Sequence, residues 1–530
     1  MSATDSDSAD SADTADTAKR RPPLTAALAL FGAAFLAMLD LSISMVALPA
    51  IRDDLHSSLS GLQWTVDAYT LCFAGLLLTG GLISDRLGHR VGLLSSLTLF
   101  TVGSVVCAIA PDTGTLIAGR AVQGAGAAML VPSSMALIAT LYPGAKERAK
   151  MLGLWSALSG VAIALGPVLG GVLVDLVSWR AIFAINLPLG IVAFLFAASS
   201  IPKVARRLTA RLDVPGVVLG IVWSFALAFA IIEGAVEGWG SPLIVGGFVL
   251  AGVSLIAFLL VERGKEHAML PLGLFRSRGF TSASVIAFAL GFSLSTAFYL
   301  LSLHLQQVLG YSALKAGFGF LPAAVAMALT APVGGRLAGK YGARPATVLG
   351  VLIGMVGLFS MSFVGPDTPF PMIAWMLLLI GCGLGMALPP NNHAALSAVP
   401  PERVGSASGT VQTMMQFGTV VGIAVLGAIQ ASVFRGDLLD RLTGDGVGDA
   451  LARTAVDALA SGRSEAVPGF SVEALASATA EAFAAGLSWA WTVAAAMALV
   501  AAVAALLISP RARPAAETSA DEPRSDVGVL

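Results

Sequence analysis

The chain has 530 residues, of which 56% are hydrophobic and only 12% are charged. This composition excludes a water-soluble globular protein, because so few charges cannot cover a water-facing surface, and it predicts a polytopic membrane protein. The net charge of −1 gives no reason to expect a nucleic-acid partner.

The membrane-crossing elements are predicted from runs of about 20 apolar residues, the length that crosses the hydrocarbon core as an α-helix. Fourteen such runs lie, in chain order, at 24–49, 62–84, 91–110, 115–141, 151–174, 181–200, 214–233, 242–261, 282–305, 314–335, 345–365, 370–388, 408–430 and 485–508. We therefore expect an all-α protein with 14 transmembrane helices. An even number of spans places both termini on the same side.

The positive charges indicate which side that is. Of the 31 Lys and Arg residues, 23 lie in segments on the side of the two termini, 6 on the opposite side and 2 inside predicted spans. Cytoplasmic loops carry the excess of Lys and Arg in membrane proteins. We therefore expect a multi-pass protein of the cell (inner or cytoplasmic) membrane, with both termini in the cytoplasm.

An internal repeat divides the spans into two groups. Residues 81–90, GLISDRLGHR, recur as 335–344, GRLAGKYGAR, 254 residues later. Both copies precede a span that enters from the same side, which predicts two six-helix halves.

The predicted domain organisation follows from these halves. It consists of a cytoplasmic tail at 1–22, an N-terminal half at 23–200, a linker with two extra transmembrane helices at 201–281, a C-terminal half at 282–508 with an external loop at 431–484, and a cytoplasmic tail at 509–530. We expect the tails to be disordered. The loop is expected to be a surface insertion rather than a cap over an exit path, with residues 471–487 able to form a helix on the outer face.

Three charged residues lie well inside spans, where charge is costly and marks function by default. Asp40, Asp67 and Arg120 each lie about six to nine residues below the outer end of their span, which at 1.5 Å per residue is roughly 9–13 Å below the outer surface. We expect them to face one shared cavity and to carry protons. A buried ion pair that merely locks helices is the alternative, but one arginine cannot neutralise two carboxylates.

The run at 159–174, SGVAIALGPVLGGVLV, predicts a helix that bends and packs on protein. Glycines let a neighbouring backbone approach closely in lipid. Pro167 removes one backbone hydrogen bond and kinks the helix. The same pattern is also typical of a kinked packing helix with no further role.

Five aromatic residues are candidates for holding a flat lipophilic cation by stacking and cation–π contact. They are Trp64, Tyr69, Trp155, Phe298 and Tyr299. Trp64 and Tyr69 are also compatible with an aromatic belt at the membrane interface, and the other three with core packing.

Neither a metal nor a cofactor is expected. Cys72, Cys107 and Cys382 all fall inside apolar runs, which argues against a disulfide framework or a metal cluster. The chain has no GxxxxGK[ST] motif and no HExxH motif, so we expect neither an ATP-driven pump nor a membrane enzyme.

Six motifs in these spans resemble the fourteen-span drug:proton antiporters of the major facilitator superfamily. They are LDLSISMVALP at 39–49, WTVDAY at 64–69, GLISDRLGHR at 81–90, GRAVQGAGAA at 119–128, LGPVLGG at 165–171 and WRAIFAINLPLG at 179–190. The resemblance covers residues 24–508. It implies the major facilitator fold, with the two extra helices between the halves.

The resemblance also implies roles for particular residues. Asp40 and Asp67 match positions that bear on proton coupling and cationic substrates, and Arg120 matches one that bears on proton transfer. A cytoplasmic gate is implied for Gly81, Asp85, Arg86, Gly88 and Arg90. The antiporter motif, whose helix lies against the other half in this family, is matched by Gly166, Pro167, Gly170 and Gly171.

Two features depart from the family pattern. Gly339 stands in the second copy of the repeat where Asp85 stands in the first, so a charged latch is expected on one half only. Span 10 has no acid around Met327, and span 13 offers Gln412 and Gln416, which argues against dicationic substrates.

Together these observations predict a proton-driven exporter of amphipathic, monocationic drugs, dyes or antibiotics that works by alternating access. An exporter dedicated to one antibiotic or natural product is the alternative. A channel fits the composition, but paired halves with buried acids argue for alternating access. A sensor would need a soluble domain, and the longest segment outside the predicted spans is the 54-residue loop 431–484. The expected partners are a small amphipathic substrate, protons and the lipid bilayer. The chain is expected to act as a monomer, with an adaptor protein left open.

Overall fold

The computed structural model describes residues 23–142, 144–202, 213–263, 265, 272–400, 403–444, 448–460 and 472–508. Over these residues the chain is helical and contains no strand. Helices suit a bilayer, because each one satisfies its own backbone polar groups where no water is present. The predicted tails at 1–22 and 509–530 lie outside the described residues.

The helices follow one another along the chain with short connections. The first half contains α2 (Leu24–Leu55), α3 (Leu59–Leu87), α4 (His89–Ala108), α5 (Thr113–Leu141), α6 (Ala145–Leu176), α7 (Ala181–Ala184) and α8 (Asn186–Ser200). A hairpin of α9 (Val214–Glu237) and α10 (Pro242–Arg263) follows. The second half contains the short 3-10 helix η1 (Leu272–Arg276), α11 (Arg278–Leu303), the π-helix η2 (His304–Val308), α12 (Ala313–Gly319), α13 (Leu321–Tyr341), α14 (Ala343–Ser360), η3 (Met361–Phe363), α15 (Phe370–Ser397), α16 (Val404–Gly444), α17 (Asp449–Ala460) and α18 (Val472–Leu506).

Each of the fourteen predicted spans corresponds to helix in the structure. Thirteen stretches within the described residues are long and apolar enough to cross a membrane by length and composition. The remaining one is α3, which has 29 residues and packs against α5 and α16. Its polar residues include Gln63 and Asp67, which lie inside the bundle. The all-α fold with 14 long helical spans is therefore confirmed.

The segment 431–484 differs from its prediction as an external loop. α16 does not end near residue 430 but continues to Gly444, and α18 begins at Val472. The predicted helix at 471–487 is helical from Val472 onwards, but it continues into the last span as the first turns of α18. Between α16 and α18 the chain forms α17. This helix buries Ala452, Ala455 and Val456 in the same core as the ends of α16 and α18. Apolar periodicity inside an alanine-rich segment thus forms packed helix rather than loop.

The internal repeat is visible in the packing. In the first half α3 and α4 both pack on α5, and in the second half α13 and α14 both pack on α15. Gly88 joins α3 to α4 at φ 89°, and Gly342 joins α13 to α14 at φ 90°. Such a left-handed conformation favours glycine at both positions. The two copies of the sequence repeat therefore form the same sharp helix–helix connection.

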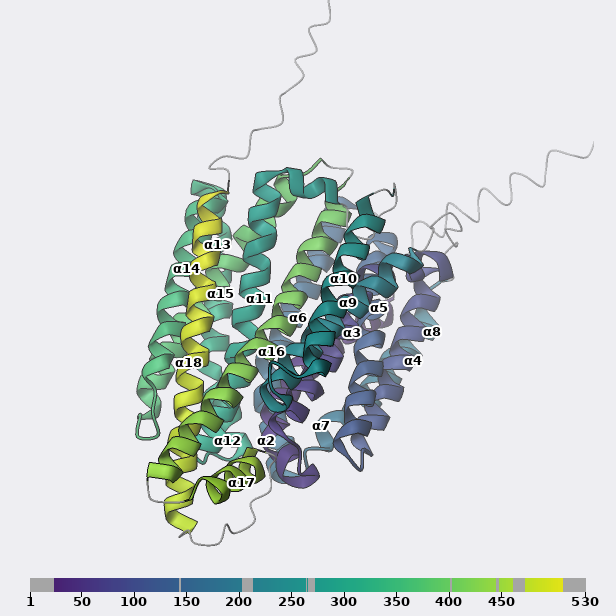
Figure 1. Ribbon diagram of the computed structural model, residues 1–530. Helices are drawn as coiled ribbons and strands as arrows, with labels where there is room; N and C mark the ends of the chain where they lie inside the picture. Colours follow the sequence, from purple (N-terminus) through teal and green to yellow (C-terminus); the bar gives the residue numbers. More distant parts are fainter. Residues whose placement is uncertain are drawn as a thin grey trace, which may run out of the picture.

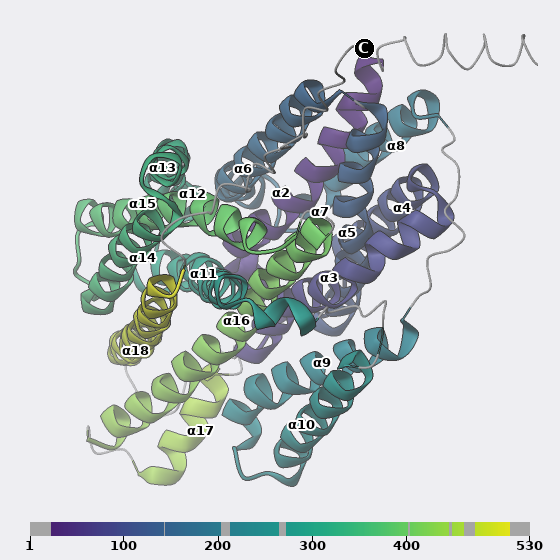
Figure 2. The same ribbon diagram turned by 90° about the horizontal axis from the view of Figure 1, so that it is seen from above.

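The two halves lie beside each other, and the hairpin of α9 and α10 stands at one side of the bundle (Figure 1 and Figure 2). α3 of the first half packs on α16 of the second, and α6 of the first packs on α12 of the second. α9 contacts both α3 and α16.

Candidate functional site

A buried ion pair joins α2 to α5 inside the first half. Arg120 donates through Nη1 to Oδ2 of Asp40, and both side chains are fully buried. The two residues were expected at a similar depth, and the structure brings them into direct contact. Two opposite charges without water need further hydrogen bonds to be tolerated in such a place.

Two amides supply those bonds to Asp40. Its Oδ1 accepts from Gln123 Nε2 at 3.1 Å and from Asn186 Nδ2 at 2.7 Å. Gln123 also donates to Ser104 Oγ at 2.8 Å. Both oxygens of Asp40 therefore accept hydrogen bonds, and the network around it includes residues of α2, α4, α5 and α8.

Arg120 is held by further contacts on α3. Its Nε donates to the backbone carbonyl of Thr65 at 3.0 Å, and its guanidinium lies 4.3 Å from the ring centre of Tyr69. Tyr69 in turn donates its hydroxyl to the carbonyl of Ala37 on α2 at 3.1 Å. Tyr69 therefore fixes the arginine by a cation–π contact and is fully covered by it and its neighbours.

Asp67 has a different environment from Asp40. Its side chain is fully buried, and neither carboxyl oxygen has a hydrogen-bond partner in the described part of the chain. The guanidinium of Arg120 binds Asp40 instead. The structure thus separates the two predicted carboxyls into Asp40, which is ion-paired with Arg120, and Asp67, which has no partner among the described residues.

Tyr299 of α11 brings the second half close to Asp67. It is fully buried and lies within electrostatic reach of Asp67 and of Arg52 on α2. One turn further along α11, Ser302 donates to the carbonyl of Met45 on α2 at 2.7 Å. The unpaired carboxyl of the first half therefore lies beside a contact between the two halves.

The other aromatic candidates are not gathered around these residues. Trp64 donates to Glu233 Oε1 of α9 at 2.7 Å, and Trp155 donates to Ser134 Oγ at 3.1 Å. Phe298 stacks on a phenyl ring of the second half, Phe320, with ring centres 5.2 Å apart. Each ring thus has its own packing partner in this structure.

The glycines of the antiporter motif lie where α6 crosses other helices. A side chain at Gly166 would collide with Ser42 of α2, and one at Gly170 would meet the carbonyl of Ile43 at 2.8 Å. A side chain at Gly171 would collide with the backbone of Ala313 on α12. α6 therefore lies between its own half and the opposite half, with no room for larger side chains.

α12 approaches α6 equally closely from the other side. A side chain at Gly317 would collide with the backbone of Pro167. Asp175, at the end of α6, accepts from the backbone N–H groups of Ala313 at 3.1 Å and Leu314 at 3.0 Å. The antiporter motif is thus part of a tight contact between the halves, which ends in a carboxylate that caps α12.

The predicted gate residues are described in part. The side chains at Gly81 and Asp85 lie outside the described residues, so their role stays a prediction. Arg86 is exposed, and Arg90 donates to the carbonyl of Ala198 on α8 at 2.5 Å. Together with the sharp turn at Gly88, this bond fixes the start of α4 within the first half.

In the second half an apolar pocket takes the place of the charged network. Gly124 of α5 presses against the backbone of Tyr69 on α3, and Gly381 of α15 presses against the backbone of Ala323 on α13. Because Ala323 follows Tyr69 by 254 residues, the offset of the repeat, the two glycines occupy equivalent positions. Counting back four residues from each aligns Arg120 with Leu377. Leu377 and Phe298 line a pocket with an empty volume of about 360 Å³, whose other walls are also apolar.

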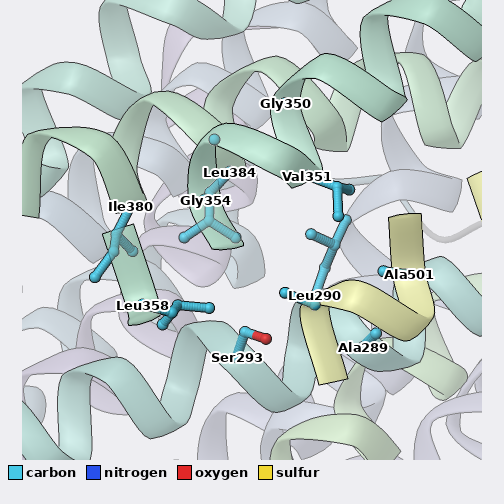
Figure 3. Close-up of a pocket in the computed structure, with 12 residues that line it drawn as sticks. Ala289, Leu290, Ser293, Gly350, Val351, Gly354, Leu358, Ile380, Leu384 and Ala501 are labelled. Carbon is cyan, nitrogen blue, oxygen red and sulfur yellow. The ribbon is translucent and has the colours of Figure 1, made fainter. Parts of the chain in front are cut away.

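A second apolar pocket, with an empty volume of about 330 Å³, adjoins the first and lies between α11, α14, α15 and α18 (Figure 3). Ile380 and Leu384 line both pockets. Ser293 is the polar side chain at its wall, and its hydroxyl oxygen is buried without a partner among the described residues. The second half therefore offers apolar surface where the first half offers charge.

Two residues of the site were missed by sequence reasoning. Gln123 and Asn186 lie inside motifs that carry the resemblance, but neither was selected. The available signal was a primary amide in an apolar run, which is costly in lipid unless it is hydrogen-bonded. Glu233, which binds Trp64, gave the same kind of signal near the end of α9.

Comparison with known proteins places these features in a family. Residues 30–423 match the family described as Major Facilitator Superfamily. The chain is 34% identical over 395 residues to a methylenomycin A resistance protein of Bacillus subtilis, covering 74% of this chain and 84% of that protein. It is 34% identical over 398 residues to the multidrug resistance protein Stp of Mycobacterium tuberculosis, covering 75% and 74% of the two chains.

A third relative is the cephamycin export protein CmcT of Amycolatopsis lactamdurans, 35% identical over 434 residues, with 80% of this chain and 88% of that protein covered. Among solved structures, a bacterial homologue of the human lysosomal transporter Spinster, in an inward-facing and occupied conformation, matches with a TM-score of 0.63 at 19% identity. That match covers 91% of this chain and 96% of the other, and it supports the fold alone.

Proposed function

Because the chain belongs to the major facilitator superfamily, a family of membrane transporters, we propose that it is a proton-coupled exporter of amphipathic monocations such as drugs, dyes or antibiotics. The observation that carries the proposal is the contrast between Asp40, whose charge is fully paired, and Asp67, which is buried without a partner. Substrate export is supported by the resistance and export proteins among the relatives.

Asp67 is proposed to hold the transported proton in this conformation. A carboxylate taken out of water with neither a cation nor a donor is strongly disfavoured, whereas a protonated carboxyl group is tolerated. Tyr299 of the opposite half lies within electrostatic reach of Asp67. Separation of the halves would admit water to the carboxyl group, so that its proton could leave and a cation could take its place.

Asp40 and Arg120 are proposed to take part in proton coupling as a pair. The two opposite charges cancel within the pair, and Gln123 and Asn186 donate hydrogen bonds to Asp40 that offset the cost of burying it. Any movement that draws α2 away from α5 would free a carboxylate and a guanidinium together. Such a pair can respond to a proton or to a cationic substrate, which supports its predicted role in coupling.

Alternating access is proposed to use the contact between α6 and α12. Backbones that touch at Gly171 and Gly317 carry no side chains between them, so the surfaces can slide without repacking. The hydrogen bond from the Ala313 N–H to Asp175 stabilises that contact only while the end of α6 touches the start of α12.

The substrate is proposed to be amphipathic because the two halves offer different surfaces. The first half contributes carboxyl groups, and the second contributes apolar walls around Phe298 and Leu377. A flat cation with a lipophilic body satisfies both. A metal or cofactor has no part in this proposal, which uses the proton gradient as the energy source.

The second candidate is export of one antibiotic only. It is supported by relatives whose names each give a single compound, methylenomycin A, puromycin or cephamycin. A toxicity panel on cells with and without the protein separates the candidates. A dedicated exporter protects against one scaffold, and a multidrug exporter protects against several unrelated monocations. Both candidates place the chain in the cell membrane with cytoplasmic termini, acting as a monomer.

Transport in proteoliposomes tests the proposal directly. Exchange of one proton for one monocation moves no net charge, so a pH gradient drives it with about 1.4 kcal/mol per unit. A second proton would add about 2.3 kcal/mol per 100 mV of membrane potential. We expect an imposed pH gradient to accumulate ethidium or tetraphenylphosphonium in vesicles with the wild-type protein. Asp67→Asn should abolish this accumulation but retain exchange of labelled for unlabelled substrate. Undiminished accumulation by Asp67→Asn would refute the role of Asp67.

A further inference from the structure

The hairpin of α9 and α10 belongs to neither six-helix half, and it contacts both. α9 packs on α3 of the first half and on α16 of the second. One apolar cluster joins Trp64 and Leu71 of α3, Ala228 and Ile232 of α9, and Val420 and Ala424 of α16. α9 therefore covers the seam between α3 and α16 (Figure 2).

The contacts of α9 with α3 are specific. Glu233 accepts a hydrogen bond from Trp64 Nε1 at 2.7 Å. The indole also packs on Phe225 and Phe229, with ring centres 5.1 and 6.4 Å away. A charge-assisted bond of this kind is directional, and breaking it leaves a carboxylate and an N–H group without partners in apolar surroundings.

A second contact with α3 lies three turns deeper. A side chain at Gly75 of α3 would lie 3.2 Å from Cγ1 of Ile221 on α9. The two helices therefore touch closely both near the Trp64 end and near the middle of α3. Two separated contacts fix the direction of one helix on the other.

The contacts of α9 with α16 are of another kind. Trp223 packs on Phe417 with ring centres 4.5 Å apart, and the remaining contact is made by small or branched apolar side chains. Apolar contacts in a bilayer are lost at little cost, because lipid tails replace them.

The hairpin is closed on itself at its base. Lys265, after α10, forms an ion pair with Asp213, which also caps α9 by accepting from the Gly216 N–H at 2.9 Å. α9 and α10 pack together along their lengths. The hairpin is therefore one unit, and any movement of α9 carries α10 with it.

We propose that the hairpin is anchored to the first half through α3 and slides on α16, so that it travels with the first half and keeps the α3–α16 seam closed to lipid when the halves move. The proposal rests on the rocking of the halves in the proposed function. It assigns Glu233 and Trp64 the role of anchor, and Trp223 and Phe417 that of a sliding contact.

Distance measurements test the proposal without requiring transport. Spin labels on Ile221→Cys and on a site in α3 should give one narrow distance at pH 5 and pH 9, with and without tetraphenylphosphonium. Labels on α9 and α16 should give distances that shift or broaden with those conditions. A fixed α9–α16 distance together with a changing α3–α9 distance, or no change in either pair, overturns the proposal.

Cross-linking adds a functional readout. The native residues Cys72, Cys107 and Cys382 are first replaced, and the reduced form of each variant is its own reference. A disulfide between Gly75→Cys and Ile221→Cys should leave the transport rate within about twofold of that reference, because these helices move together. A short thiol cross-linker between Trp223→Cys and Phe417→Cys should lower the rate about tenfold, and its removal should restore the rate.

Different results would contradict the proposed export function and the proposed movement of the hairpin. A reduced protein that transports no substrate argues against export, while the distances still report on the hairpin. Full transport with α9 cross-linked to α16 overturns the sliding contact and leaves the proposed export intact.

Discussion

Asp175 in the first half accepts a hydrogen bond from the backbone N–H of Ala313 in the second half at 3.1 Å. The carboxylate thereby caps α12 from the opposite half. The positive end of a helix favours a negative charge. This bond exists only while α6 and α12 are in contact, and it therefore reports which end of the bundle is closed.

We expect Asp175→Ala to loosen this end of the bundle. Loss of a helix cap costs about 1 kcal/mol, which corresponds to about a fivefold shift in the equilibrium between closed and open forms. A cysteine at Ala316, which is fully buried on α12, should react about fivefold faster with an impermeant maleimide. Asp112→Ala is the control, because Asp112 caps α5 within the first half by accepting from the Thr115 N–H at 2.8 Å. Equal labelling in wild type and Asp175→Ala contradicts the capping role.

Gly170→Leu should leave the protein in the membrane but impair transport. A side chain there meets the carbonyl of Ile43, so α6 would be pushed away from α2. Gly160→Leu is the matched control on the same helix, because a side chain at Gly160 meets nothing within 4 Å. Initial efflux rates, normalised to the amount of protein in the membrane, provide the measurement. If both variants transport equally well, the close contact of α6 serves packing only.

Asp40→Asn and Asp67→Asn should both stop proton-driven accumulation but should differ in stability. Asp40→Asn leaves Arg120 buried without its counter-charge, which costs about 3–5 kcal/mol. Asp67→Asn replaces an unpaired carboxyl group with a neutral group of the same shape, so little change in melting temperature is expected. Thermal unfolding in detergent measures this difference. The double variant Asp40→Asn with Arg120→Gln should recover stability without recovering transport, because both charges are removed together.

Accumulation of substrate by the Asp40→Asn protein is the result that would contradict this prediction. If the Asp40→Asn protein accumulates a monocation against its gradient at the wild-type rate, Asp40 is a structural residue. The coupling mechanism proposed for the pair would then be wrong.

Tyr299→Phe should slow proton exchange at Asp67 more than substrate exchange. The change removes only the hydroxyl group that the second half places near Asp67. We expect proton release on adding substrate to fall several-fold, while exchange of labelled for unlabelled substrate stays near the wild-type rate. Tyr311→Phe removes the hydroxyl of a tyrosine whose ring centre lies 3.5 Å from Lys315 Nζ, and it serves as the control. Parallel loss of both activities would indicate that Tyr299 acts only in packing.

The sequence by itself determined the fold. Apolar length predicts the spans, their even number predicts a common side for both termini, the distribution of Lys and Arg predicts that this side is the cytoplasm, and the repeat at 81–90 and 335–344 predicts paired halves. The structure contains helix at every predicted span, and Gly88 and Gly342 adopt the same backbone conformation. These features depend on local composition and on the bilayer, which leaves helices as the simplest way to satisfy the backbone.

The sequence also selected Asp40, Asp67 and Arg120, because charge inside an apolar run is rare. It did not determine how they pair. Only the tertiary structure places Arg120 against Asp40, adds Asn186 and Gln123 around them and leaves Asp67 buried without a partner among the described residues. Those contacts depend on how each helix is rotated about its axis and on which neighbour it meets, and residue spacing along one helix does not contain that information.

Because spacing along the chain does not show which helices pack together, the sequence also failed to predict the packing of segment 431–484 and the partners of the aromatic candidates. A segment rich in Asp and Gly as well as Ala, with mixed charge and no apolar span, favours a loop, but neighbouring helices bury Ala452, Ala455 and Val456 and stabilise α17. Trp64 was expected either in a shared cavity or in an interfacial belt, whereas Glu233, about 170 positions away in the chain, supplies its partner on α9. The sequence shows which polar and aromatic residues lie inside apolar spans. Only the packing of helices that are distant in the chain decides which of these residues contact one another.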